Sequence, residues 1–443
     1  MKAYDGQGSA FDRASRVFLV LSLLAYLCLS PALLTVLGIP YDAPYGSFVF
    51  KLHPGSYLLT IALALSLAEQ GNPLAALLRR LAGQPLLGLY LLAMLSGFVY
   101  SLLRYGASGS AFFIDTLMMP AAIALILLRL DAAQLRGLFR LILIMVTANA
   151  ALGLVEAVVQ HHLVPYTVAG GVPVIEDKFR ATALLGHPLE NALITSIVLL
   201  ASLDRPMSPL WRASLIAFLV LALLAFGGRT SFVLTTLALL AYTAWGALHG
   251  LRAGRYGYLH IVGASIAVLL ALPMAMALVW RSGLGARIFE GLYLDDSATV
   301  RLRIFSVFDH LDRFDVLFGI SPAQIHAVSA RVGLSANLEA IENFWLFMLL
   351  QLGVFGFAVF ALGLLCALWL LWRRAGSGGR WTLLVFLVTA STTNSLASKT
   401  SALTLLFAVL CGVAGYRALG AHAAAAERRI APRQAFSRIG ARA

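Results

Sequence analysis

Long apolar segments, separated by short arginine-rich breaks, follow one another through most of this chain. A helix needs about 20 mainly apolar residues to cross a bilayer, because its backbone groups find no hydrogen-bond partners in hydrocarbon. By this criterion we predict about twelve spans. They lie at residues 17–38, 56–69, 84–103, 111–130, 138–159, 184–202, 210–226, 230–248, 258–280, 342–372, 381–397 and 401–418. The sequence therefore predicts an all-α polytopic membrane protein, in which the long tenth span tilts or projects beyond the bilayer.

The composition agrees with this interpretation. Of the 443 residues, 60% are hydrophobic and 12% are charged, whereas soluble domains have about 45–50% apolar and about 25% charged residues. These values exclude a soluble enzyme and a disordered chain. The net charge of +13 would suggest nucleic-acid binding in a soluble protein, but most of the basic residues lie in the breaks between apolar segments. They are therefore interpreted as determinants of membrane topology.

The basic residues predict the orientation of the spans, since loops rich in lysine and arginine stay on the cytoplasmic side. The cytoplasmic set contains Lys2, Arg13, Arg16, Arg79, Arg80, Arg136, Arg140, Arg205, Arg212, Arg252, Arg255, Arg373, Arg374 and Arg380. Residues 1–421 are thus predicted to form one transmembrane domain, with both termini in the cytoplasm. Residues 422–443 form a basic tail that is attracted to anionic lipid.

The longest loop, residues 281–341, lies between the ninth and tenth predicted spans, on the outer face. Within it, Ile304, Val307, Phe308 and Leu311 recur at helical spacing. We therefore expect an amphipathic helix that lies at the membrane interface or packs as an ordinary loop helix.

Basic residues on the predicted outer face are not needed for membrane insertion, so they are candidates for anion binding. This set consists of Lys51, Arg104, Lys178, Arg180, Arg229, Arg281, Arg287, Arg301, Arg303, Arg313, Arg331 and Lys399. Arg229 follows two glycines between two apolar segments, where it is either a snorkelling side chain or an anion ligand. A planar guanidinium group can bind phosphate through two parallel hydrogen bonds. Arg180, Arg229 and Arg301 would therefore suit a diphosphate if they converged.

Three carboxylates are placed unusually. Asp115 and Glu190 fall within apolar spans, and Glu342 stands at the start of the tenth span, next to Asn343. A carboxylate inside the membrane is a candidate functional group, although Asp115 would serve equally as a structural partner for an arginine. His187 and Asn191, beside Glu190, either contact substrate or form a hydrogen-bonded helix entry. His53, on the outer face, is interpreted as a bystander.

Motifs for nucleotide or metal binding are missing from the sequence. It contains no P-loop, Rossmann glycine pattern, HExxH motif or nucleophile elbow, and its adjacent acidic pairs lack clustered metal-ligand partners. We therefore expect neither a metal site nor a cofactor.

Four short elements, in this order, resemble the family of O-antigen ligases and Wzy-type polysaccharide polymerases. Residues 226–231, FGGRTS, are similar to the family's short Arg-Thr element at a helix start. Residues 301–305, RLRIF, and 318–320, FGI, are similar to elements of its large periplasmic loop. Residues 342–356 are similar to its His-Asn segment with a later Gly-x-x-Gly, except that Glu342 replaces the usual histidine.

The resemblance implies a metal-independent membrane glycosyltransferase of the periplasmic face, which joins undecaprenyl-diphosphate-linked oligosaccharides into exopolysaccharide or O-antigen. Glu342 would be the general base, and Arg229 and Arg301 would stabilise the leaving diphosphate. The substrate-binding residues would be Lys178, Arg180, His187, Glu190, Arg303 and Asn343. The partners that it implies besides the bilayer are a chain-length regulator and a flippase, and no nucleic acid.

Glu342 also bears on which of the family's two activities, polymerase or ligase, the sequence favours. In the ligases the histidine at this position is implicated in catalysis, so its replacement favours a polymerase over a ligase that transfers glycan to lipid A-core. A transporter or flippase is the alternative from a different class. The polar residues argue against it, because they cluster at the outer face and not along a pathway through the midplane.

Overall fold

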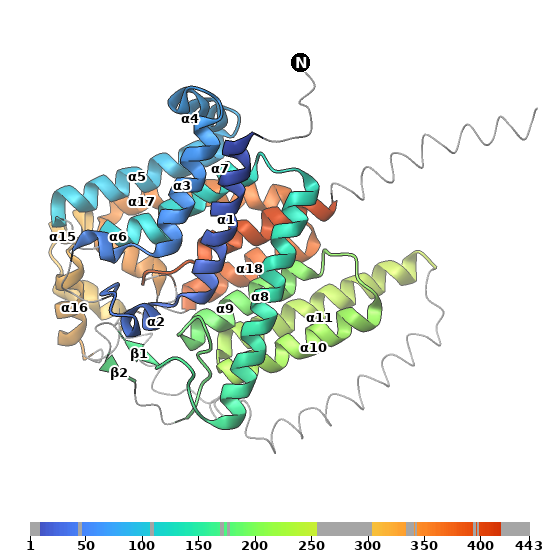
Figure 1. Cartoon of the computed structure of the whole chain (residues 1–443). Helices are drawn as coiled ribbons and strands as arrows, with labels where there is room; N and C mark the ends of the chain where they lie inside the picture. The colour runs from blue at the N-terminus through green and yellow to red at the C-terminus, as the bar shows by residue number, and fades with distance from the viewer. Residues whose placement is uncertain are drawn as a thin grey trace, which may run out of the picture.

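The structure is a computed structural model of the whole chain, shown in Figure 1. It describes residues 9–42, 47–106, 110–168, 172–174, 178–254, 304–333, 341, 343–392, 396 and 398–417. Within these residues the chain is helical apart from one antiparallel pair of two-residue strands, β1 (Thr167–Val168) and β2 (Val172–Pro173). The predicted all-α class is therefore confirmed in its coarse form.

The helices follow one another closely. The first half contains α1 (Ala10–Cys28), α2 (Pro31–Val36), η1 (Phe48–Lys51), α3 (Pro54–Ala68), α4 (Pro73–Ala82), α5 (Pro85–Tyr105), α6 (Ser110–Phe112), η2 (Phe113–Met118), α7 (Met119–Leu127) and α8 (Ala132–Val159). The second half contains α9 (Pro188–Ser202), α10 (Pro209–Phe226), α11 (Arg229–Arg252), η3 (Ile304–His310), α15 (Arg313–Phe318), α16 (Pro322–Arg331), α17 (Phe344–Arg374), α18 (Ser377–Thr392) and a last helix, Ala402–Arg417.

Six helical segments of the described chain are long and apolar enough to cross a membrane. They are α5, the segment Ser110–Leu127, α8, α10, α11 and α17. Helices α3 and α4 qualify only as a pair bent by 96°, which would make seven. Because α9 and the last helix are apolar but shorter, the expectation of about twelve spans stays a prediction. The predicted ninth span and the tail at 422–443 lie outside the described residues.

Several helices begin where the sequence supplies a capping side chain followed by proline. Ser208, before Pro209, accepts a hydrogen bond from the backbone N–H of Trp211, and His53 accepts one from Gly55 just after the helix start at Pro54. Proline suits the first turn because its missing N–H would have no helical partner there. These local signals fix where the helices start, and therefore which side chains are grouped at each end of the bundle.

Helix α9 lies in the middle of the bundle, packed against α8, α10, α11 and α18 (Figure 1). Its residues from Asn191 to Ser202 are all buried. The outer helices, in contrast, expose large apolar side chains; Leu103 of α5, for example, is 82% exposed. An apolar surface of this kind is typical of helices that face lipid.

Helix α17 is broken at Gly353, whose φ of 66° is left-handed. Gly319, at φ 78°, lies directly against it, and a Cβ atom there would come within 2.6 Å of the backbone N of Gly353. Because both residues are glycines, the backbones of the two segments can touch. The end of α5 holds them there: Arg104 donates to Gly319 O (2.9 Å), and Tyr105 donates to Gln351 O (3.0 Å). The long tenth span is therefore two helical pieces, a feature that its continuous apolar sequence does not reveal.

The described part of the outer loop forms a small core of its own. Ile304 and Val307 of η3 are buried with Ile325 of α16 against Leu346 and Leu350 of α17. The predicted amphipathic helix is thus a short 3₁₀ helix that packs on α17 as an ordinary loop helix. This packing fixes the described part of the loop over the start of α17.

Candidate functional site

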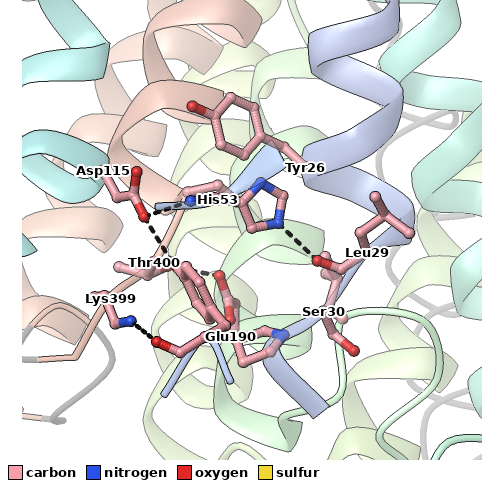
Figure 2. A pocket seen from close by; sticks show the side chains of 12 residues that line it. Tyr26, Leu29, Ser30, His53, Asp115, Glu190, Lys399 and Thr400 are labelled. Carbon is pink, nitrogen blue, oxygen red and sulfur yellow. Dashed lines mark hydrogen bonds between the residues drawn. The ribbon is translucent and has the colours of Figure 1, made fainter. Parts of the chain in front are cut away.

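A pocket opens where the end of α1, the start of α3, η2, the start of α9 and residues 399–401 come together (Figure 2). It has about 330 Å³ of empty space, including the part open to the surroundings. We call it the carboxylate pocket, because Asp115 and Glu190 both line it. By the orientation that the basic loops predict, it lies at the outer end of the bundle.

Asp115 is held at the inner wall of this pocket by three hydrogen bonds. Its carboxylate accepts from the Tyr41 hydroxyl (2.9 Å), the Ser56 hydroxyl (2.6 Å) and the backbone N–H of His53 (2.9 Å). The side chain is 2% exposed and belongs to η2, a π-helical stretch, a kind of distortion that is frequent at functional sites. None of these described partners is an arginine, so the alternative in which Asp115 pairs with an arginine stays a prediction.

His53 joins the start of α3 to the end of α1. Its Nδ1 accepts from the backbone N–H of Gly55 (3.0 Å), and its Nε2 lies 2.7 Å from the carbonyl O of Leu29, to which it donates in the neutral tautomer that this pair of bonds defines. The ring stacks on Tyr26 at 4.9 Å. Burial lowers the pKa of His53 to about 4, in accordance with the neutral form. The residue is therefore a structural element of the pocket and not a bystander.

Lys399 contributes the cation of the pocket. Its ammonium pairs with Asp42 at 3.0 Å, lies 3.7 Å above the Tyr41 ring, and donates to the backbone carbonyls of Tyr41 and Lys51. The ammonium thus joins the segment before the last helix to the loop after α2, which lies more than 300 residues earlier in the chain. Because Tyr41 also donates to Asp115, one side chain bridges the cation and the buried carboxylate.

Glu190, in the first turn of α9, points into the same pocket (Figure 2). Its Oε1 accepts from the Thr400 hydroxyl at 2.6 Å, and the backbone N–H of Thr400 donates to Thr116 at 3.1 Å. The residue is half-buried and belongs to the lining of the pocket. A carboxylate in this position can accept a hydrogen bond from a substrate hydroxyl.

Arg180 lies against the turn that joins α10 to α11. The turn residue Gly227 has a φ of 65°, and a Cβ atom there would lie 3.1 Å from Cγ of Arg180. The backbone N–H of Ala181 also donates to Ala225 O at 3.0 Å. Arg229, the first residue of α11, is two residues further on and half-buried, as Arg180 is. The structure therefore brings two of the three predicted phosphate-binding arginines to one turn.

Tyr166 and His187 complete this group, which we call the arginine cluster (Tyr166, Arg180, His187 and residues 227–229). The Arg180 guanidinium lies 5.6 Å from the centre of the Tyr166 ring, which meets the His187 ring edge-on at 5.7 Å. Burial, and then the charge of Arg180, lower the pKa of His187 to about 4. Its Nδ1 accepts from the backbone N–H of Leu189 at 3.2 Å, so His187 caps α9 in its neutral form.

A buried polar scaffold holds the segment between Arg180 and His187 in place. Glu156, which is 1% exposed, accepts from the backbone N–H groups of Thr182 (2.7 Å) and Ala183 (2.8 Å). Asn149 donates to Asn191 at 2.6 Å, and Asn191 donates to the carbonyl O of His187 at 2.9 Å. Asn191 and His187 therefore form the hydrogen-bonded helix entry that the sequence left open as one alternative.

The remaining predicted site residues are distributed as follows. Lys178 is exposed, two residues before Arg180. Asn343 caps α17 by accepting from the N–H of Leu346 at 3.1 Å, and the adjacent Phe344 lines an apolar pocket together with Thr116. Arg301, Arg303 and Glu342 lie outside the described residues, so their predicted roles stay predictions.

Sequence reasoning missed the roles of Tyr41, His53 and Lys399. A histidine directly before Pro54 is a signal for a helix cap, and Lys399 stands between the last two predicted spans, where insertion requires no cation. Neither signal reveals that the two residues share a pocket with Asp115 and Glu190. Comparison with known proteins adds nothing to these assignments, since no family model and no curated protein matches the chain.

Proposed function

We propose that the protein is a membrane glycosyltransferase that transfers a glycan between undecaprenyl-diphosphate-linked oligosaccharides at the outer face of a bacterial inner membrane. The observation that carries this proposal is the contact between Arg180 and Gly227, which sets Arg180 beside the turn that leads into Arg229. Both arginines were selected from the sequence as ligands of a lipid diphosphate. Their proximity across 49 residues of chain supports that assignment.

The chemistry of a sugar diphosphate requires the groups that this turn presents. When the bond from the sugar to the diphosphate breaks, negative charge develops on the leaving oxygen, and fixed guanidinium groups stabilise that charge. Arg180 and Arg229 lie at the end of the bundle that the basic loops predict to be outer, where a diphosphate anchored in the outer leaflet would be held. Tyr166 keeps the Arg180 guanidinium in place.

The carboxylate pocket is the proposed binding place for the acceptor sugar. Glu190 lies in the first turn of α9, which His187 of the arginine cluster caps. The residues that bind the donor diphosphate and those that bind the acceptor sugar would therefore lie side by side. Its carboxylate, held by Thr400, would orient an acceptor hydroxyl. Glu342, next to the cap residue Asn343, remains the proposed general base that removes the proton of that hydroxyl.

We propose a polymerase over a ligase because Glu342 stands where the ligases have a histidine. Lipid-linked repeat units extracted from the source cells, incubated with the purified protein, should be lengthened by whole repeats. Arg180→Lys and Arg229→Lys should each lower the rate by about 10²-fold, because lysine keeps the charge but loses the paired hydrogen bonds.

The matched control is Arg252→Lys, since Arg252 lies at the opposite end of α11 and is exposed. Its rate should equal that of the wild type. Transfer to lipid A-core without lengthening would instead identify a ligase. Movement of the lipid-linked units across liposomes, without lengthening or transfer, would identify a transporter.

A further inference from the structure

A second cavity lies at the other end of the bundle, away from the carboxylate pocket. It has about 480 Å³ of empty space, including the part open to the surroundings. Its walls come from the end of α7, the start of α8, the end of α17 and the end of the last helix. Apart from Arg374, Cys411 and Ala414, the residues that line it are leucines, among them Leu135. By the predicted orientation, this apolar cavity opens at the cytoplasmic leaflet.

Arginines from four segments gather around the end of the last helix, beside this cavity. Arg374 lines it, and Arg417 donates to the carbonyl O of Arg374 at 2.8 Å. Tyr416 accepts from Arg140 at 3.4 Å and lies 5.9 Å from the guanidinium of Arg205. Arg136 follows the lining residue Leu135, and a Cβ atom on Gly415 would lie 3.4 Å from its Cγ.

Within the described residues, these five arginines form no ion pair with a carboxylate. The hydrogen bonds of Arg374, Arg136 and Arg140 go to neutral groups: to Gln84, to the carbonyl O of Ala132 and to Tyr416, respectively.

The acids nearest in sequence, Asp131 and Asp204, are used to cap the N-termini of α8 and α18. Positive charge thus accumulates beside an apolar cavity without a described counter-ion.

We infer that this cavity binds an anionic phospholipid of the cytoplasmic leaflet. The leucine-lined interior suits an acyl chain, and the guanidinium groups of Arg374 and Arg417 suit the phosphate at its head. An inorganic phosphate would use the arginines but leave the apolar walls without a partner, and a neutral lipid would do the reverse. An anionic phospholipid, the abundant anionic lipid of a bilayer, satisfies both features of the site.

The inference is tested on the full-length protein purified with equal amounts of phosphatidylglycerol and phosphatidylethanolamine. Native mass spectrometry then counts the lipids that stay bound. The wild type should retain phosphatidylglycerol in preference, and Arg374→Gln should reduce that retention about fivefold, since one arginine near a lipid surface contributes about this factor. The matched control Arg252→Gln removes an exposed arginine at the same predicted face, away from the cavity, and should change nothing.

Ala414→Trp fills the cavity without changing the charge, and it keeps the test decisive if Arg374→Gln does not fold. It should displace the retained phosphatidylglycerol while the protein remains folded. Equal retention of the two lipids by the wild type would overturn the inference. So would an unchanged preference in Ala414→Trp, because the lipid would then be held by the general positive charge of the surface. Neither outcome bears on the proposed glycosyl transfer, which is measured separately at the other end of the bundle.

Discussion

The two ends of the bundle differ in whether their charged side chains are paired. In the carboxylate pocket, Asp115 is bonded to two hydroxyls and an N–H, Glu190 to Thr400, and Lys399 to Asp42. At the other end, Arg140 and Arg374 bond only to neutral groups among the described residues. A network with every group paired fixes one geometry, whereas unpaired surface cations attract an anion from outside. The first end therefore suits the positioning of a substrate, and the second suits the attraction of an anionic lipid.

The largest expected effect concerns the sides of the membrane on which the two ends lie. In a protein whose three native cysteines are replaced by serine, His326→Cys, on exposed α16, should react with a membrane-impermeant thiol reagent once the outer membrane is permeabilised. Arg252→Cys should react only after the inner membrane is lysed. Labelling of both before lysis, or of Arg252→Cys alone, would contradict the predicted orientation and the proposed site with it.

Asp115→Ala should destabilise the protein by about 3–5 kcal/mol, because it leaves the Tyr41, Ser56 and His53 donors buried without an acceptor. Arg140→Gln, at the other end, should change the free energy of unfolding by less than about 0.5 kcal/mol. Thermal or denaturant unfolding in detergent measures both variants. Equal losses of unfolding free energy in the two variants would show that the pairing of charges does not distinguish the two ends.

Gly227→Ala tests the contact that forms the arginine cluster. Alanine at a φ of 65° costs about 1–2 kcal/mol, and its Cβ would lie 3.1 Å from Cγ of Arg180, which displaces the stem of that arginine. We expect glycan lengthening to fall about tenfold or more, beyond what the loss of folded protein explains. Gly246→Ala, in the α11 helix that follows this turn, is the control, since no atom lies within 4 Å of the added Cβ. It should leave both stability and activity unchanged, or raise stability slightly.

A smaller effect is expected from pH. The pKa of His187 is about 4 in the folded protein, below the ordinary value of about 6.5, so the unfolded chain binds a proton more readily. The stabilisation is complete above pH 6.5 and is lost as the pH falls towards 4. At pH 5 this one residue should account for about 2 kcal/mol of lost stability.

His187→Asn keeps a good helix cap and removes the titrating ring. The pH dependence of its free energy of unfolding should therefore be shallower than that of the wild type. His249→Asn, on the exposed end of α11, should retain the wild-type dependence. Identical curves for His187→Asn and the wild type would show that burial of this histidine does not govern the acid sensitivity.

The sequence predicts the class of the fold and part of the site. Arg180 and Arg229 are recognisable because cations on an outer face have no role in insertion, and Glu190 because carboxylates are rare in apolar spans. The partners of Asp115 could not be predicted, since Tyr41 and Ser56 are ordinary residues whose proximity depends on how the loop after α2, helix α3 and η2 pack. The break at Gly353 is equally hidden, because a glycine in an apolar run usually marks close helix packing and not a left-handed turn.

The proposed role of Arg180 and Arg229, which is to hold a lipid diphosphate together, can be tested without knowing the sugar. Binding of undecaprenyl diphosphate to the purified protein should be stronger than binding of undecaprenyl monophosphate. Arg180→Gln and Arg229→Gln should each weaken diphosphate binding by about 10–100-fold, while Arg252→Gln binds as the wild type does. Equal affinity for the two lipids, or undiminished diphosphate binding in both arginine variants, would show that these arginines do not bind the diphosphate.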